Sequence, residues 1–166
     1  MTHNDVLRSL RYLLNVSDAA MVDIFRLGNR EVSRAEVVAF LKTEDDEGYQ
    51  ACSDKALAHF LNGVIIYKRG KDEGRPPQPV ELPVTNNTVL KKVRVAFELK
   101  DDDIIALLQR TGLKLSKTEL GALFRRPDHR NYRECGDQVL RNFLKGLSSP
   151  STNTQRPPGA SVDGAR

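Results

Sequence analysis

The sequence predicts an all-α protein, a tandem duplication of a four-helix module of about 60 residues. Three observations support this prediction: an internal repeat, apolar residues at helical spacing, and capping residues at matching positions in both copies. Shifting the chain by 83 positions aligns residues 4–64 with residues 87–147 without a gap, and about a quarter of the aligned pairs are identical. This is several times the identity expected from residue frequencies alone, so we infer a duplication.

Apolar spacing predicts the first two helices of each copy. In the first helix, apolar side chains form one face at positions 7, 10 and 14, and again at 90, 93 and 97. The second helix begins near Asp18 or Asp101, residues of a type that caps helices. It ends before Gly28 or Gly112, which suit a helix C-terminus.

The third and fourth helices have clear start signals. The third begins with a capping box, Ser33 to Glu36 in the first copy and Ser116 to Glu119 in the second. After a loop, the fourth helix opens at Asp54 or Asp137. Its apolar positions are 57, 60, 61 and 64, or 140, 143, 144 and 147.

The chain divides into four segments: helical repeat 1 (3–69), a Pro/Gly-rich linker (70–86), helical repeat 2 (87–147) and a tail (148–166). Pro76, Pro77 and Pro79 exclude a continuous helix in the linker and favour an extended spacer. The tail has almost nothing to bury, so we expect it to be disordered. Because a 60-residue unit is marginally stable alone, we expect the repeats to pack on each other or on a second chain.

Composition indicates a cytoplasmic protein that does not enter a membrane. No stretch approaches the roughly 18 apolar residues of a membrane span, and the first ten residues lack the pattern of a secretory signal. Two cysteines are too few for a disulfide scaffold or a four-thiolate zinc site, so a reducing compartment is expected. We expect no metal and no cofactor.

Three strings in the chain, NDVLRSLRYLLNVSDAAM, GYQACSDKALAHFLNG and RRPDHRNYRECGDQVLRNFLKGL, resemble the YehS-type bacterial family. This domain-of-unknown-function family is built as a tandem pair. The resemblance covers about residues 3–148 and includes both Y-x-x-C-x-D-x-x-L-x-x-F-L-x-G signatures. It implies a helical tandem fold and a bacterial cytosolic setting, and it implies no activity, substrate or catalytic residue.

The signature repeats three residues, which are Tyr49, Cys52 and Asp54 in one copy and Tyr132, Cys135 and Asp137 in the other. A cysteine before a helix N-terminus can become a nucleophile if its thiol pKa is lowered. We instead expect small buried core residues, because no histidine matches in both copies. We expect the aspartates to be helix caps. We expect the tyrosines to anchor the loop, with stacking on a base as the alternative.

The motifs of catalysis are missing from the sequence. It has no glycine-rich phosphate cradle, no nucleophile elbow and no zinc-binding histidine pair. We therefore expect that the protein is not an enzyme.

Charge distinguishes the two copies most sharply. Residues 4–69 carry nine basic and ten acidic side chains, whereas residues 87–147 carry thirteen basic and eight acidic ones. Before the fourth helix, residues 42–49 read KTEDDEGY and residues 125–132 read RRPDHRNY. The candidate nucleic-acid-binding residues are Arg125, Arg126, His129, Arg130, Tyr132, Arg133 and Lys117. Arginines beside a tyrosine and a histidine suit a phosphate backbone with a stacking platform.

Further basic residues would extend this positive field: Lys91, Lys92, Arg94 and Lys114. Lys117 stands early on the third helix, in a helix pair that resembles a helix-turn-helix. We expect a non-catalytic protein whose second copy contacts the backbone of RNA or DNA. The alternative is a protein-interaction module or homodimer, in which the acidic loop of repeat 1 pairs with a basic surface, within one chain or across a dimer. A charged loop can also be merely solvated.

Overall fold

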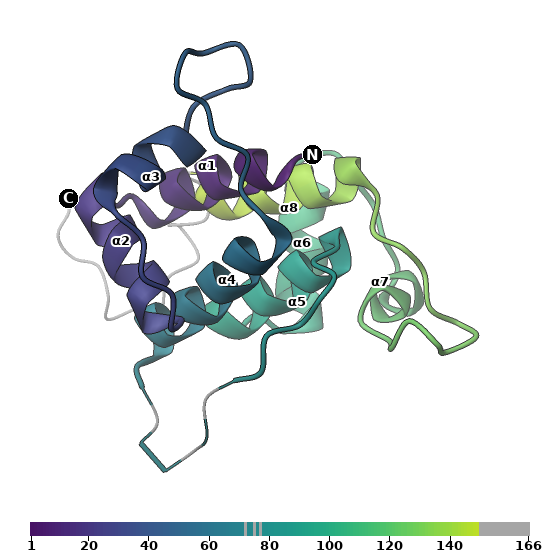
Figure 1. Ribbon diagram of the computed structural model, residues 1–166. Helices are drawn as coiled ribbons and strands as arrows, with labels where there is room; N and C mark the ends of the chain where they lie inside the picture. The colour runs from purple at the N-terminus through teal and green to yellow at the C-terminus, as the bar shows by residue number, and fades with distance from the viewer. Residues whose placement is uncertain (72, 75, 77, 150–166) are drawn as a thin grey trace, which may run out of the picture.

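The computed structural model describes residues 1–71, 73, 74, 76 and 78–149. These residues form eight helices and no strand: α1 (His3–Leu14), α2 (Asp18–Leu27), α3 (Arg34–Phe40), α4 (Asp54–Arg69), α5 (Asn86–Phe97), α6 (Asp101–Arg110), α7 (Lys117–Leu123) and α8 (Asp137–Ser148). The predicted all-α tandem fold is confirmed (Figure 1). Of the tail predicted to be disordered, Ser148 ends α8, and residues from 150 onward lie outside the described residues.

Helix capping follows the sequence for the third helix of each repeat and differs for the fourth. Ser33 and Ser116 both form the predicted capping boxes. The prediction that Asp54 and Asp137 cap the fourth helices is wrong, because the N-cap residues are Ser53 and Gly136. Each aspartate is instead the first residue of its helix, and its carboxylate binds a neighbouring segment.

The second helices are also capped one residue earlier than their aspartates suggest. Ser17 is the N-cap of α2, and Lys100 is the N-cap of α6. The aspartates that follow these residues form ion pairs with arginines of the preceding helix. Arg11 pairs with Asp18 at 3.2 Å, and Arg94 pairs with Asp101 at 2.8 Å. The same contact in both repeats joins the first helix to the second.

The predicted apolar faces build one core that runs through both repeats. All eight apolar positions predicted for the fourth helices are buried. In repeat 1, the ring of Phe25 lies 4.8 Å from that of Phe60 and 6.1 Å from that of Phe40. Burial of these faces supplies the main driving force for folding.

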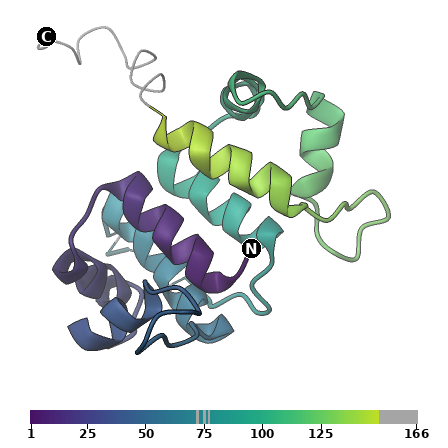
Figure 2. The same cartoon turned by 90° about the horizontal axis from the view of Figure 1, so that it is seen from above.

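The repeats pack on each other through a reciprocal exchange of helices. The first helix of each repeat lies against the fourth helix of the other, so α1 packs on α8 and α5 packs on α4 (Figure 2). The Asp54 carboxylate accepts a hydrogen bond from the Val84 amide at 3.0 Å. The Asp137 carboxylate accepts one from the Met1 amino group at 2.5 Å. Val84 and Met1 are aligned positions of the duplication, so the two contacts are related by a pseudo-two-fold axis.

The end of the linker is attached to the helices and is not a free spacer. The Asn62 side-chain amide on α4 donates to the carbonyls of Gln78 and Pro79, at 3.3 and 3.2 Å. Glu81 pairs with Lys91 and Lys92 of α5, at 3.1 and 3.2 Å. Residues 78–81 therefore cover the groove between α4 and α5.

Candidate nucleic-acid interface

The basic cluster predicted from the sequence lies on the loop between α7 and α8, which we call the basic loop (residues 124–136). Backbone hydrogen bonds give this loop a defined path. The His129 amide donates to the Arg126 carbonyl and the Tyr132 amide donates to the His129 carbonyl, both at 2.9 Å. The Arg133 amide donates to the carbonyl of Ala122 on α7 at 3.1 Å. The loop is thus a folded structure before any ligand binds.

Asn87 on α5 attaches both ends of the basic loop to the repeat. Its side-chain amide donates to the carbonyls of Leu123 and Arg133, each at 2.9 Å, and its side-chain oxygen accepts from the Cys135 amide at 2.9 Å. We assigned Asn87 no role from the sequence. The available signal was its identity with Asn4 at the aligned position of repeat 1.

Arginine side chains on the basic loop face solvent. Arg125, Arg126, Arg130 and Arg133 are all exposed. Arg126 pairs with Asp128 at 2.9 Å. Hydrogen bonds with Ser116 lower the pKa of Glu119, and the positive charge of Arg133 adds a smaller effect in the same direction. Within the described residues, the guanidinium groups of Arg125 and Arg130 make no hydrogen bond or ion pair. These two cations are the groups most available to a phosphate.

The aromatic members of the cluster lie differently. His129 is exposed and lines a shallow hollow of about 400 Å³ with Arg125, Arg126 and Asp128. Its Nδ1 accepts a hydrogen bond from the Asn131 amide at 2.9 Å. Tyr132 is partly buried, and this burial raises the pKa of its hydroxyl. The tyrosine ring is thus only partly accessible for stacking.

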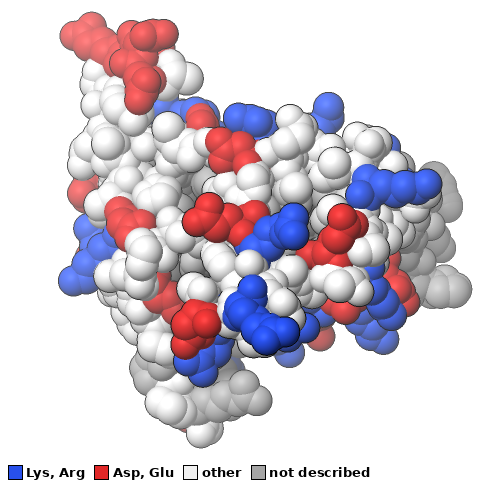
Figure 3. Space-filling model, turned by 90° about the vertical axis from the view of Figure 1, so that its right-hand side faces the viewer, with Lys and Arg blue, Asp and Glu red and all other residues white. Residues whose placement is uncertain are grey.

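The other predicted basic residues are not all part of this surface. Lys117 begins α7, at the opposite end of that helix from the start of the basic loop, and pairs with Asp102 at 3.6 Å. Lys92 is buried between the repeats, which excludes it from any surface field. Arg94 stacks over the ring of Phe124 at 4.5 Å. Figure 3 shows the face that carries α7: basic side chains gather near its middle, with acidic side chains between and around them.

Repeat 1 has a loop of the same path and opposite charge, the acidic loop (residues 42–53). Asn4 takes the place of Asn87, and its amide donates to the carbonyls of Phe40 and Gln50 at 2.8 and 2.9 Å. The acidic loop projects at the top of Figure 1, and both views place it away from the basic loop. The predicted pairing of the two loops within one chain is therefore wrong.

The side chains of the signature residues other than Tyr132 have hydrogen-bond partners within the fold. Burial raises the pKa of the Cys52 thiol to about 12 and that of the Cys135 thiol to about 11, so both remain protonated at neutral pH. The Tyr49 hydroxyl donates to the Asn4 side-chain oxygen at 3.3 Å. Hydrogen bonds from the Met1 amino group and from Asn86 lower the pKa of Asp137.

Among residues 1–149, the described part contains no group of three His, Cys, Asp or Glu side chains that could hold a metal ion. None of the helices described is both long and apolar enough to cross a membrane.

Comparison with known proteins identifies a family and a relative that are similar to this chain in sequence. The uncharacterized protein YehS of Escherichia coli (strain K12) is 49% identical over 149 residues, which cover 90% of this chain and 96% of that protein. No solved structure matches the chain. The family described as "Protein of unknown function (DUF1456)" matches twice, over residues 3–70 and 86–150. The chain, with its two reciprocal four-helix repeats, therefore belongs to the DUF1456 family.

Proposed function

We propose that this protein is a non-catalytic binding protein that contacts the phosphate backbone of RNA or DNA through the basic loop. The observation that carries the proposal is the exposure of Arg125 and Arg130, which have no acidic partner among the described residues, on a loop held by hydrogen bonds. Arginine donates several hydrogen bonds in a fixed planar arrangement that matches a phosphate.

Preorganisation of the loop supports this proposal. Binding orders whatever is flexible, and each side chain or loop segment ordered on binding lowers the affinity. The turns at His129 and Tyr132, with the attachment at Asn87, order the backbone in advance. The contact is to the backbone and not to base sequence, because it rests on exposed cations at a shallow surface.

Fluorescence anisotropy of labelled mixed-sequence RNA and duplex DNA, at about 50 and 200 mM salt, tests the proposal. We expect micromolar or tighter binding at the lower salt that weakens steeply at the higher, because bound phosphates release counterions. The double variant Arg125→Gln/Arg130→Gln should lose at least about tenfold in affinity while retaining its helical circular dichroism.

The matched control removes the same charge from repeat 1. Arg34 and Lys55 are exposed basic residues outside the basic loop. Arg34→Gln/Lys55→Gln should bind almost as the unaltered protein does. Equal losses in both variants, or no binding of the unaltered protein at low salt, would contradict the site.

Self-association is the second candidate function, and the acidic loop favours it. Glu44, Asp45 and Glu47 are exposed, and their carboxylates make no ion pair with any described residue. Because both loops follow the same path with opposite charge, the acidic loop of one molecule can meet the basic loop of another head to tail. Sedimentation should then show larger species at low salt that dissociate at high salt, whereas a monomer in both removes this candidate.

We also propose the cytoplasm as the compartment in which the protein acts. Cys52 and Cys135 are buried free thiols, which fits a reducing environment.

A further inference from the structure

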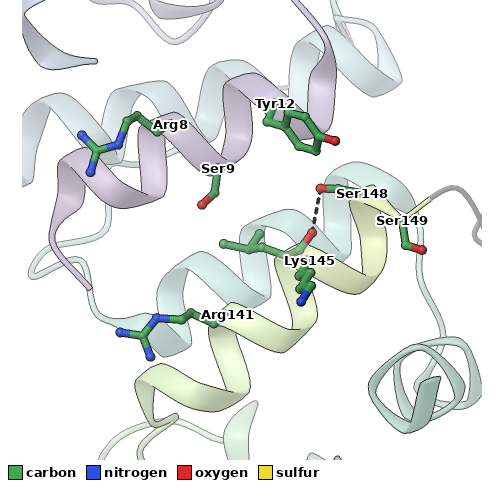
Figure 4. A pocket seen from close by; sticks show the side chains of 8 residues that line it. Arg8, Ser9, Tyr12, Arg141, Lys145, Ser148 and Ser149 are labelled. Atoms are coloured by element: carbon green, nitrogen blue, oxygen red, sulfur yellow. Dashed lines mark hydrogen bonds between the residues drawn. The ribbon is translucent and has the colours of Figure 1, made fainter. Parts of the chain in front are cut away.

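A groove with a volume of about 620 Å³ lies between α1 and α8 (Figure 4). Ser9 and Tyr12 line it from α1, and Leu144 and Lys145 line it from α8. Tyr12 is 75% exposed, more than any other large hydrophobic residue described. An exposed aromatic ring beside the apolar side chain of Leu144 is a surface suited to a binding partner.

The pseudo-two-fold axis relates this groove to the one between α5 and α4, which the chain itself fills. Under the shift of 83 positions, Ser9 corresponds to Lys92 and Lys145 corresponds to Asn62. In the filled groove, Asn62 donates to two linker carbonyls and Lys92 pairs with Glu81. Val80, between those contacts, packs against the core. The filled groove therefore shows how an extended segment ending in an acidic residue fits this type of surface.

The open groove between α1 and α8 has the same two features that bind the linker segment in the filled groove, an apolar floor and a lysine ammonium. Leu144, which is 2% exposed, corresponds to the buried Leu61 and forms an apolar floor. A lysine ammonium is again present, supplied by Lys145 of α8 instead of Lys92 of α5. Lys145 is exposed and, within the described residues, has no hydrogen bond or ion pair. The groove thus offers an unpaired cation beside an apolar surface.

The sequence contains a second segment like the one that fills the first groove. Residues 75–81 read RPPQPVE, and residues 156–163 read RPPGASVD. Both have Arg-Pro-Pro followed by valine and an acidic residue, with one extra residue between in the second. Glu81 is 16 residues beyond Ile65, and Asp163 is 15 residues beyond Ser148, the position aligned with Ile65. Fifteen residues span up to about 50 Å, which is ample to return along a 12-residue helix of about 18 Å.

We propose that residues 156–163 bind in the groove between α1 and α8 of the same chain, as residues 78–81 bind in the related groove. Val162 then contacts Tyr12 and Leu144, and the Asp163 carboxylate pairs with Lys145. The groove is a site for an extended, proline-containing segment with an acidic end.

Site-specific photo-crosslinking in the full chain tests the proposal. Tyr12→p-benzoylphenylalanine places a photoreactive ring in the groove, and mass spectrometry identifies the residues to which it couples. We expect crosslinks to residues 156–163 of the same chain. The matched control is Tyr67→p-benzoylphenylalanine, since Tyr67 is an exposed tyrosine of α4 outside the groove, and it should give none.

Charge-reversal variants and isotope labelling complete the crosslinking experiment. Lys145→Glu should reduce the Tyr12 crosslink by at least about threefold, whereas Lys114→Glu, at an exposed lysine elsewhere, should leave it unchanged. Mixing isotopically light and heavy protein separates crosslinks within a chain from those between chains. Crosslinks only between chains, equal yields from positions 12 and 67, or no crosslink to residues 156–163 would overturn the proposal.

Discussion

At the scale of single residues, two aligned asparagines organise the molecule. Asn4 is buried, and its side chain makes three hydrogen bonds to the backbone, one to Phe40 at the end of α3 and two to Gln50 and Cys52 of the acidic loop. Asn87 makes the same three bonds in repeat 2. Each asparagine donates two of these bonds and accepts the third, and among short side chains only its amide supplies two N–H donors together with an oxygen acceptor, which explains why both repeats have asparagine in spite of the opposite charges of the two loops.

Asn4→Ala should destabilise the fold by about 1–3 kcal/mol, because the buried Cys52 amide and the Phe40 carbonyl lose their partner. Urea unfolding followed by circular dichroism measures the change. Asn131→Ala is the control for the loss of an exposed asparagine, because the Asn131 side chain makes no hydrogen bond within the described residues and its backbone is not left-handed. A loss below about 0.5 kcal/mol for Asn4→Ala would mean that water replaces the side chain.

At the scale of elements, the crossing of α2 and α4 depends on two glycines. A Cβ atom placed on Gly63 would lie 2.0 Å from the Ile24 carbonyl oxygen, and one on Gly28 would lie 1.9 Å from the His59 carbonyl oxygen. The backbones of the two helices therefore approach as closely as they can without side chains between them. In repeat 2, Gly146 meets the side chain of Leu107 instead, so the corresponding crossing is less tight.

Gly63→Ala should destabilise the protein by about 3 kcal/mol or more, since backbone atoms cannot move aside as a side chain can. Gly121→Ala is its matched control inside α7, where a Cβ atom meets nothing within 4 Å. That substitution should stabilise by about 0.5–1 kcal/mol, because alanine favours the helix. Thermal unfolding of both variants checks the pair. A mild effect at Gly63 would show that the helices can separate.

The contact between the linker and α5 should make stability depend on pH. Burial alone would raise the pKa of Glu81, but the hydrogen bond from Lys91 and the charge of Lys92 lower it below the usual 4.5. Such a carboxylate stabilises the fold above its unfolded pKa and loses that contribution as pH falls through its folded pKa.

Glu81→Gln should therefore be less stable than the unaltered protein at pH 7, and the difference should shrink as the pH is lowered below about 4.5. Urea unfolding at pH 7, 5 and 3.5 measures both curves. Glu73→Gln, in the same linker, should follow the unaltered protein at every pH. Parallel curves for Glu81→Gln would show that its ion pairs contribute nothing measurable.

At the scale of the whole molecule, neither repeat buries its own first helix completely. α1 rests on α8 and α5 rests on α4, so each repeat completes the core of the other. A module of about 60 residues is also only marginally stable alone, because it buries a small share of its surface. We therefore expect the two repeats to unfold as one cooperative unit.

The full chain should unfold in a single transition. Circular dichroism reports on all helices, and reaction of Cys135 in a Cys52→Ala variant reports on repeat 2 alone, because the buried thiol reacts only after opening. Both probes should give the same urea midpoint. Leu7→Ala in repeat 1 should shift both midpoints together. Two separate transitions would indicate independent repeats.

The helices, the duplication and the charge of each loop could all be predicted from the sequence. Those features depend on local spacing and composition: the apolar periodicity of α4 and the capping boxes at Ser33 and Ser116 are complete within a few residues. The signal for Asn4 and Asn87 was also present, as an identical pair in the repeat, but its meaning required the positions of the loop carbonyls.

The way in which the two repeats combine could not be predicted from the sequence and is visible only in the folded molecule. The exchange of first helices, the burial of Lys92 and the separation of the two charged loops all depend on residues far apart in the chain. The same holds for Asp54, which resembles a helix cap in sequence and instead binds the Val84 amide of the other repeat. Local patterns specify a helix because its hydrogen bonds are local, whereas packing depends on which apolar faces meet when the whole chain has folded.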